Sequence, residues 1–349
     1  MRTSIVKALI TIMAITLLSA CSLDSIATPA PTSEATVMTL TDITSVPAPI
    51  STSAVEQVDL LHTLSGHSRR VMNVAFSANG ALVASSSDDM QIKLWDVESG
   101  QETHTFQMTS IDMMDIAFSP DGSLLASGEA IWDVESKQEL HTLERGRHIP
   151  TQVAFSPDGS LLAVALFFQP IQLWDVESGQ VVRIFDEEAD NRTTTIEFSP
   201  DGALLAAGIN DGTIRLWDIE SGEISDSLKY AGESDIHDIA FSPDGRYLAS
   251  GGRVPSVRIW DLASGEVVST FRLQEGLMSV DFSPDGTILA STGGIEHAVR
   301  LWDVESGSLL RSLPHNDQLM AVAFSPDGKL LAAGCNDNQV YLWGISTEP

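Results

Sequence analysis

Residues 196–228 read IEFSPDGALLAAGINDGTIRLWDIESGEISDSL, and close variants of this stretch recur along most of the chain. Apolar residues alternate with smaller or polar ones around Phe198, and a Pro-Asp-Gly turn follows at residues 200–202. Two further turns, at residues 211–212 (Asp-Gly) and 220–222, separate segments rich in β-branched and aromatic side chains. The unit is therefore predicted to hold four short antiparallel strands, a to d, joined by three tight turns.

The repeat occurs seven times. The turn motif FSPDG stands at six places between residues 118 and 328, and a variant, FSANG, begins at Phe76. The third strand of each repeat ends in a tryptophan, and consecutive tryptophans are 37 to 43 residues apart. The seven are Trp95, Trp132, Trp174, Trp217, Trp260, Trp302 and Trp343.

These LWD endings and their spacing resemble WD repeats, which build β-propellers with one four-stranded blade per repeat of about 40 to 45 residues. The resemblance implies an all-β fold: a seven-bladed β-propeller of four-stranded antiparallel blades, over residues 59–349. Because stacked repeats must close on themselves or be capped, seven blades in a ring form one domain.

The two ends of the repeat region complement each other. Residues 59–64, DLLHTL, precede the first complete repeat and match the d-strand segment at residues 139–143. At the other end, residues 339–343 form a third strand that only six residues follow. We therefore expect residues 60–64 to pair beside residues 340–342, which closes the ring and removes two exposed strand edges.

The resemblance also implies a buried hydrogen-bonded set in the first repeat. In WD repeats a His before strand a, a Ser or Thr of strand b, a turn Asp and the Trp form this set. The matching residues are His67, Ser85 or Ser87, Asp89 and Trp95. The set is incomplete in the other repeats, whose blades are expected to rely more on apolar packing.

Repeat two departs furthest from the pattern. Ser127 and Trp132 are five residues apart, where Ser85 and Trp95 are ten apart. Its second hairpin is therefore predicted to be cut short, with a turn near residues 128–129 and a notch in the rim of the ring.

Residues 1–20 have the features of a secretory signal: two early basic residues, then an apolar run at residues 8–18 that is too short to span a bilayer. The tetrapeptide Leu-Ser-Ala-Cys at residues 18–21 resembles the lipobox of bacterial lipoproteins, which implies lipid attachment at Cys21. The alternative is an ordinary cleavage site with a chance cysteine. The lipoprotein interpretation predicts an exported protein, anchored to the outer side of the cytoplasmic membrane or to the outer membrane.

Residues 21–58 are rich in Thr, Ser, Pro and Ala and show no stable apolar period. This composition predicts a disordered tether between the anchor and the propeller.

The charge excludes a nucleic-acid partner. The chain carries 48 Asp and Glu against 19 Lys and Arg, a net charge of −29, whereas phosphate contacts need clustered basic residues. Much of the acidity lies in the a–b and c–d turns, where it is expected to serve turn chemistry and solubility; a surface for calcium or a cationic partner is the alternative.

Signatures of common enzymes are absent from the sequence: no CxxC, HExxH, GxSxG, GxGxxG or P-loop motif occurs. Beyond Cys21 the one remaining cysteine is Cys335, so no disulfide is expected within the propeller. We expect a non-catalytic monomer without cofactor or metal. The alternative is a hydrolase or lyase with a small-molecule or metal site in the central channel, where Asp115 and Asp238 could converge on a cation.

The d–a and b–c connections differ in every repeat, unlike the turns on the other side, so they are the part of the surface able to carry specificity. Arginines and exposed aromatic side chains are enriched at protein interfaces. We expect these connections to bind a protein partner, and charge steering favours an acidic one. The alternative is that nearby acidic residues balance the arginines and that the aromatic rings pack between blades. The residues concerned are Arg69, Arg70, Arg145, Arg147, His148, Phe167, Phe168, Arg192, Tyr230 and Arg253.

Overall fold

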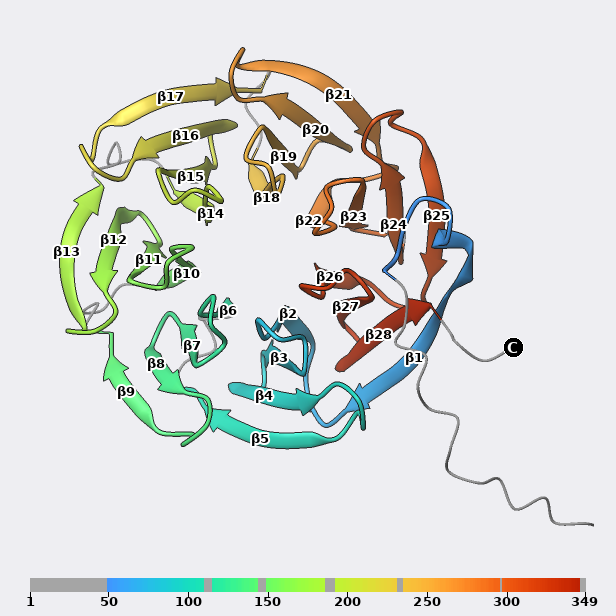
Figure 1. Ribbon diagram of the computed structural model, residues 1–349, viewed down its shortest axis with the longest axis horizontal. Coiled ribbons are helices and arrows are strands. Elements are labelled where there is room, and N and C mark those ends of the chain that lie inside the picture. Colours follow the sequence, from blue (N-terminus) through green and yellow to red (C-terminus); the bar gives the residue numbers. More distant parts are fainter. Residues whose placement is uncertain are drawn as a thin grey trace, which may run out of the picture. The chain divides into compact units, whose positions relative to one another are not determined.

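The computed structural model describes residues 49–109, 115–143, 149–185, 192–230, 235–295 and 297–345. The chain divides into two units, residues 1–45 and residues 46–349, and all described residues belong to the second. These residues form seven four-stranded antiparallel sheets arranged as a ring, as Figure 1 shows. The predicted seven-bladed β-propeller is confirmed.

Each blade contains four strands in the order a, b, c, d. Blade 1 comprises β2 (Val71–Phe76), β3 (Leu82–Ser87), β4 (Gln91–Asp96) and β5 (Glu102–Gln107), and blade 2 comprises β6 (Ile116–Phe118), β7 (Leu124–Ser127), β8 (Ala130–Asp133) and β9 (Glu139–Thr142). Blade 3 comprises β10 (Pro150–Phe155), β11 (Leu161–Leu166), β12 (Gln169–Asp175) and β13 (Gln180–Phe185), and blade 4 comprises β14 (Thr193–Phe198), β15 (Leu204–Ile209), β16 (Thr213–Asp218) and β17 (Ile224–Lys229).

Blades 5 to 7 follow the same order, except that the last strand of blade 7 comes from the N-terminal side. Blade 5 comprises β18 (Ile236–Phe241), β19 (Tyr247–Gly252), β20 (Ser256–Asp261) and β21 (Glu266–Arg272), and blade 6 comprises β22 (Leu277–Phe282), β23 (Ile288–Gly293), β24 (Ala298–Asp303) and β25 (Leu309–Pro314). Blade 7 comprises β26 (Leu319–Phe324), β27 (Leu330–Cys335), β28 (Gln339–Ile345) and β1 (Val58–Ser65). A short 3-10 helix, η1 (Val55–Gln57), precedes β1.

The core lies between blades. The middle strands β15 and β16 of blade 4 are buried along almost their whole length, whereas the outer strand β17 is mostly exposed. Ala163 and Leu173 of blade 3 pack with Ile196, Leu205 and Trp217 of blade 4, and each further pair of neighbouring blades shares a similar cluster. Because both faces of a blade are covered by its neighbours, the b strands read as runs of apolar and small residues, such as LLAAGI in β15, whereas the c strands still alternate, as in TIRLWD of β16.

The a–b and c–d turns use their own acidic side chains. In blade 2 the Ser119 hydroxyl donates to Asp121 at 2.6 Å and accepts the Leu124 N–H at 2.9 Å. The Ser119 hydrogen bond is the main reason why the pKa of Asp121 falls to about 2. In blade 4 Asp218 accepts hydrogen bonds from both the backbone and the hydroxyl of Ser221. These bonds support the interpretation that the acidic residues serve turn chemistry.

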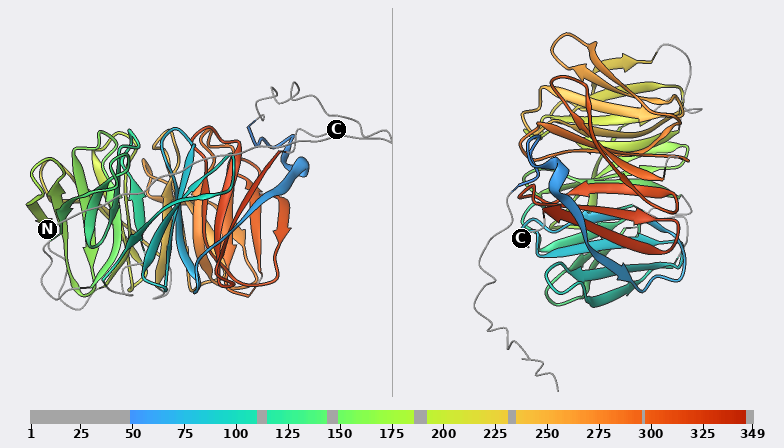
Figure 2. Two further views of the ribbon diagram at one scale, coloured as in Figure 1. Left: turned by 90° about the horizontal axis from the view of Figure 1, so that it is seen from below. Right: turned by 90° about the vertical axis from the view of Figure 1, so that its right-hand side faces the viewer.

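The turns and the connections lie on opposite faces of the ring, which Figure 2 shows edge-on. A backbone hydrogen bond joins the c–d turn at Val97 to the a–b turn at Ala81, and another joins the b–c turn at Asp88 to the d–a connection at Arg70. We call the side with the a–b and c–d turns the turn face, and the side with the d–a and b–c connections the connection face.

The ring closes as predicted. Strand β1 pairs antiparallel with β28, so that Leu60 lies opposite Trp343 and Leu64 opposite Val340. In Figure 1, β1 forms the outer edge of blade 7 beside β28.

The predicted tether extends too far, because its last part belongs to the propeller. Ile50, Val55 and Val58 are buried in the apolar cluster shared by blades 6 and 7. The Ile50 N–H donates to the Gly328 carbonyl at 2.8 Å, and the Arg311 guanidinium donates to the Val55 carbonyl at 2.9 Å. Three isolated apolar residues in an irregular segment have no strand or helix period, so the pattern at residues 50–58 resembled a tether. Residues 21–48 lie outside the described residues.

Blade 2 has the shortened hairpin that the sequence predicts. Strands β7 and β8 have four residues each, against six in β3 and β4. Glu129 in the connecting turn is buried, and its carboxylate accepts hydrogen bonds from the backbone and the hydroxyl of Thr109. The turn is therefore tied to the strand-d end of the neighbouring blade.

Candidate functional site

The structural hydrogen-bonded set is complete in blade 1. Nε2 of His67 lies 2.8 Å from Ser85 Oγ, which also accepts the Trp95 indole N–H at 2.8 Å. Nδ1 of His67 lies 3.0 Å from Asp89 Oδ2. Of the two candidate serines the structure selects Ser85, while Ser87 Oγ accepts the Asp89 N–H. Burial lowers the pKa of His67, so the ring is neutral and the set holds the connection to the adjoining turn.

Tyr230 replaces that histidine in blade 5, and its predicted place on the binding surface is wrong. Its hydroxyl lies 2.8 Å from Ser250 Oγ, which also accepts the Trp260 indole N–H at 2.7 Å. Burial raises the pKa of Tyr230 to about 12. The ring is buried because it fills the space that the absent histidine would occupy. Ser250 precedes Trp260 by ten residues, as Ser85 precedes Trp95, and this spacing was the signal that could have revealed it.

All seven predicted tryptophans are buried. In three blades without the histidine, a phenylalanine from strand d of the preceding blade packs on the indole ring. The ring centroids are 5.3 Å apart for Phe106 and Trp132, 5.3 Å for Phe185 and Trp217, and 5.5 Å for Phe271 and Trp302. In blade 6 the Trp302 indole N–H also donates to Ser291 Oγ at 2.8 Å, so there the aromatic contact adds to this hydrogen bond.

An aromatic patch lies on the connection face of blade 3. Phe167 is 36% exposed and Phe168 45% exposed, in the two-residue turn between β11 and β12. Their rings are 4.5 Å apart in an edge-to-face arrangement, and the Arg192 guanidinium lies 5.4 Å from the centre of the Phe167 ring. Ile149 is also exposed, and its carbonyl accepts the Phe167 N–H. We call Ile149, Phe167, Phe168 and Arg192 the aromatic patch.

Phe168 adopts a backbone conformation that phenylalanine disfavours, with φ at 51°. Glycine or asparagine usually occupies such a turn position, because a side chain there is strained. The ring is thus kept at a cost in stability and contributes little to the core.

The other predicted arginines are divided among several blades. Arg69, Arg70 and Arg253 are exposed on the connection face. Arg70 pairs with Asp88, and Arg192 lies 3.7 Å from Asp235, so nearby acids balance part of this charge. Arg145, Arg147, His148 and the lipid-attachment candidate Cys21 lie outside the described residues.

Among the described residues, four carboxylates on or beside the innermost strands face the central channel, two more than the sequence suggested. Each accepts a backbone N–H from the innermost strand of the next blade. The pairs are Asp115 with Val153 at 2.7 Å, Glu197 with Phe241 at 2.7 Å, Asp238 with Val280 at 2.9 Å and Asp281 with Phe324 at 2.7 Å. Innermost strands are sheet edges with unpaired N–H groups, and these carboxylates satisfy them. Glu197 and Asp281 were missed because they stand two residues further along strand a.

Burial raises the pKa of every one of these channel carboxylates. The pKa reaches about 7 for Asp115, about 6 for Asp238 and about 7 for Asp281, and that of Glu197 also rises. Repulsion from Asp238 adds to the increase at the other three, while the backbone hydrogen bonds oppose it. Each carboxylate therefore accepts a hydrogen bond that joins two blades, although burial and mutual repulsion destabilise its ionised form.

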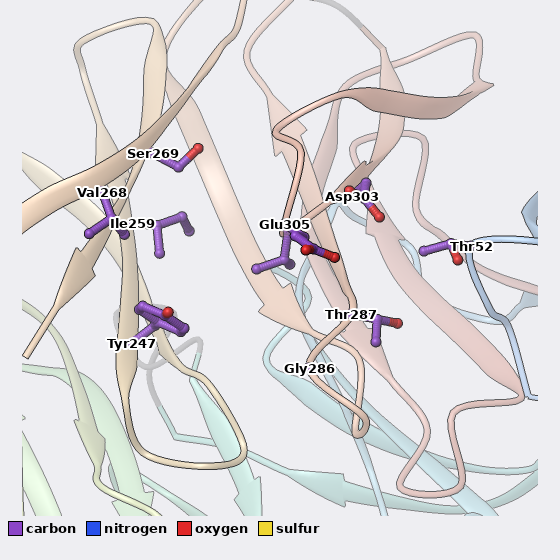
Figure 3. Close-up of a pocket in the computed structure, with 10 residues that line it drawn as sticks. Thr52, Tyr247, Ile259, Val268, Ser269, Gly286, Thr287, Asp303 and Glu305 are labelled. Atoms are coloured by element: carbon purple, nitrogen blue, oxygen red, sulfur yellow. The ribbon is translucent and has the colours of Figure 1, made fainter.

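A cavity of about 450 Å³ lies on the rim between blades 5 and 6, as Figure 3 shows. Val268 and Ser269 of β21 lie across from Thr287, Glu305 and the β24 residue Asp303 of blade 6. None of its ten lining residues is a lysine, arginine, histidine or cysteine. The Ser306 N–H and hydroxyl lower the pKa of Asp303, which leaves it as an ionised turn residue. The cavity offers hydroxyls and carboxylates without a nucleophile–base pair.

These blades, with their buried tryptophans and inter-strand hydrogen-bonded set, define a repeat propeller whose variable loops occupy one face. Five segments of the chain match the family described as WD domain, G-beta repeat: residues 58–96, 100–133, 225–261, 265–303 and 307–344. Together they cover more than half of the chain, which therefore belongs to the WD repeat family.

Two further similarities concern shorter segments. Residues 182–234 match the anaphase-promoting complex subunit 4 WD40 domain. The chain is also 49% identical over 57 residues to the vegetative incompatibility protein HET-E-1 of Podospora anserina. This match covers 16% of the chain and 4% of that protein, so the similarity extends over a small part of the relative's length.

Proposed function

We propose that the chain is a protein-interaction platform whose partner docks on the connection face, over the aromatic patch. The observation that carries this proposal is the exposure of two adjacent phenylalanine rings, with the Arg192 guanidinium over the Phe167 ring. Exposed aromatic and arginine side chains are the residues that contribute most to protein interfaces. WD repeat propellers are usually non-catalytic binding proteins, which agrees with this interpretation.

The connection face is favoured over the turn face because the acidic side chains of the turn face are engaged in hydrogen bonds within the protein. Aspartates of the turn face, such as Asp121 and Asp218, accept hydrogen bonds within their own turns. Positive φ recurs at the residue before strand c in other blades, at Met90, His297 and Asn338, so the b–c turn itself requires it, and in blade 3 this turn presents the Phe168 ring to solvent. Arg192 and Arg253 on the same face favour a partner with an acidic segment.

Phe168→Gly is expected to weaken partner binding at least about tenfold, because it removes an exposed ring from the centre of the contact. It should leave the melting temperature unchanged or slightly higher, since glycine relieves the strain at φ 51°. The partner would first be captured by cross-linking in the source cells and identified by mass spectrometry. Affinity would then be measured with the purified pair.

The matched control is Ile224→Ala, which removes an equally exposed apolar side chain from the outer strand β17. It should leave affinity unchanged. Arg192→Ala should weaken binding as Phe168→Gly does. If charge reversal at Glu220, in a c–d turn, abolishes binding while these two changes do nothing, the partner docks on the turn face instead.

We also propose that the protein is exported and anchored by lipid on Cys21. The sequence supports this with a charged start, an apolar segment and the Leu-Ser-Ala-Cys tetrapeptide in the required order. No helix in the described part of the chain is long and apolar enough to cross a membrane.

Labelled fatty acid should be incorporated into the wild-type protein in bacterial cells and not into Cys21→Ala. The control is Cys335→Ala, which removes the other cysteine and should retain the label. Equal labelling of the wild type and Cys21→Ala would show that Cys21 is not the attachment site, and an unlabelled wild type would show that the protein is not lipidated.

The channel supports a non-catalytic role. All four of its carboxylates accept a backbone N–H of the next blade, so each makes a structural contact that accounts for its place on the innermost strand. No observation in the described residues favours the hydrolase or lyase alternative.

A further inference from the structure

Three metal-ligating side chains converge in blade 7. His315 lies in the connection between β25 and β26, Cys335 ends β27, and Asp337 lies in the turn before β28. One ligand atom from each lies within 4.8 Å of the other two, and Nε2 of His315 is 3.3 Å from Asp337 Oδ2. We propose that these three side chains form a binding site for a divalent transition metal, best suited to Zn²⁺.

Blade 7 has lost the arrangement that makes the equivalent residues of blade 1 purely structural. His67 and Asp89 occupy the same positions relative to their tryptophan as His315 and Asp337. In blade 1, Ser85 bonds to both the histidine and the tryptophan.

The counterpart of that serine in blade 7 is Ala333, which has no hydroxyl. A cysteine, Cys335, stands where blade 1 has Ser87. The hydrogen-bonded set is thus broken at its serine, and a soft ligand is added beside the remaining histidine and aspartate.

The donor set suits zinc. Imidazole, thiolate and carboxylate are the three protein ligands that Zn²⁺ uses, and three of them leave a fourth position for water. Cys335 is fully buried, while the side chains of His315 and Asp337 are 12% and 27% exposed. An ion can therefore reach the site from the connection face and bind the sulfur beneath, with release of the thiol proton.

Outer contacts already orient the carboxylate ligand. The Tyr341 hydroxyl donates to Asp337 Oδ2 at 2.7 Å, and the Gln339 N–H donates to Oδ1 at 3.2 Å. The Tyr341 ring also packs against the His315 ring, with centroids 4.1 Å apart. Such second contacts fix the geometry of ligands and typically affect metal affinity by about 10- to 100-fold.

The experiment is a Co²⁺ titration of the full chain carrying Cys21→Ala, so that Cys335 is the one cysteine present. We expect a near-ultraviolet thiolate-to-cobalt absorption band that saturates at one ion per chain and disappears when Zn²⁺ is added. Cys335→Ser should abolish the band. His315→Gln and Asp337→Asn should raise the dissociation constant by more than about 100-fold, and Tyr341→Phe by about tenfold.

The matched control is His67→Gln, which alters the equivalent histidine of blade 1 and should leave the dissociation constant unchanged. Melting temperatures would verify that each variant is folded; Asp337→Asn changes a partly exposed group, and so provides a folded test if Cys335→Ser does not. Absence of the band in the parent protein, or an equal loss of affinity in His67→Gln, would overturn the proposal and leave the three residues as a hydrogen-bonded turn.

Discussion

Deleting β1 (Val58–Ser65) is expected to lower the free energy of unfolding by at least about 4 kcal/mol, a large part of the stability of a typical domain. The deletion removes Val58 and Leu64 from the core and exposes the edge of β28. Unpaired strand edges also promote association, so the shortened protein should aggregate. Urea unfolding followed by tryptophan fluorescence, together with light scattering, would measure both effects.

Two point variants on this strand provide the control. Leu64 is 1% exposed and packs between blades 7 and 1, whereas Leu60 is 51% exposed. Leu64→Ala should cost about 2–5 kcal/mol, and Leu60→Ala less than about 0.5 kcal/mol. Equal effects of the two variants, or an unchanged melting temperature in the deletion, would contradict closure of the ring by β1.

Asp281→Asn is expected to stabilise the protein by about 2 kcal/mol at pH 8 and to have no effect near pH 4. Burial raises the pKa of Asp281 from 3.8 to about 7, and repulsion from Asp238 adds to this. A fully buried group with that shift would cost about 4 kcal/mol at pH 8, and partial exposure to the channel reduces the cost. Asparagine keeps an oxygen that can accept the Phe324 N–H and carries no charge.

The direction of the pH dependence follows from the raised pKa. Below pH 3.8 the carboxyl is protonated in both the folded and the unfolded protein, so ionisation costs nothing. Between pH 3.8 and about 7 the unfolded chain releases the proton first, and the wild type loses stability as pH rises through this window. The difference between wild type and Asp281→Asn should grow over the same interval in urea unfolding at each pH.

Asp121→Asn should show the opposite trend, because hydrogen bonds from Ser119 and Ser123 lower the pKa of Asp121 to about 2. Its stabilisation is present above pH 3.8 and is lost as pH falls towards 2. This variant should therefore be less stable than wild type near neutral pH, and the difference should disappear at acid pH.

If the effect of Asp281→Asn on stability does not change with pH, ionisation of the Asp281 carboxyl does not destabilise the folded protein.

The local sequence was sufficient for the architecture because each blade is specified within one repeat. The Pro-Asp-Gly turns, the alternating apolar residues and the LWD endings determine four strands per unit. Their sevenfold recurrence determines the number of blades, and the DLLHTL segment at residues 59–64 determines how the ring closes. Repeat two also revealed its shortened hairpin, since a missing length between Ser127 and Trp132 is visible without any structure.

The aromatic patch was only partly predictable. The repeat pattern locates Phe167 and Phe168 in a b–c turn, but the sequence left open whether their rings are exposed or packed between blades, and the structure shows them exposed. The same reasoning failed at Tyr230, because its burial depends on a hydrogen bond to Ser250 on strand b of blade 5. It failed also at Ile50 and Val55, whose partners are in blades 6 and 7 at the far end of the chain.

By itself, therefore, the sequence determined the blade count, the strand order and the closing strand, all of which depend on patterns within about 40 residues. Tertiary structure alone decided which polar and aromatic side chains the ring encloses. Asp281 is a channel residue with a raised pKa because it bonds to Phe324, 43 residues further on. His315, Cys335 and Asp337 stand within one repeat, but their ligand atoms meet only once the strands of blade 7 are paired.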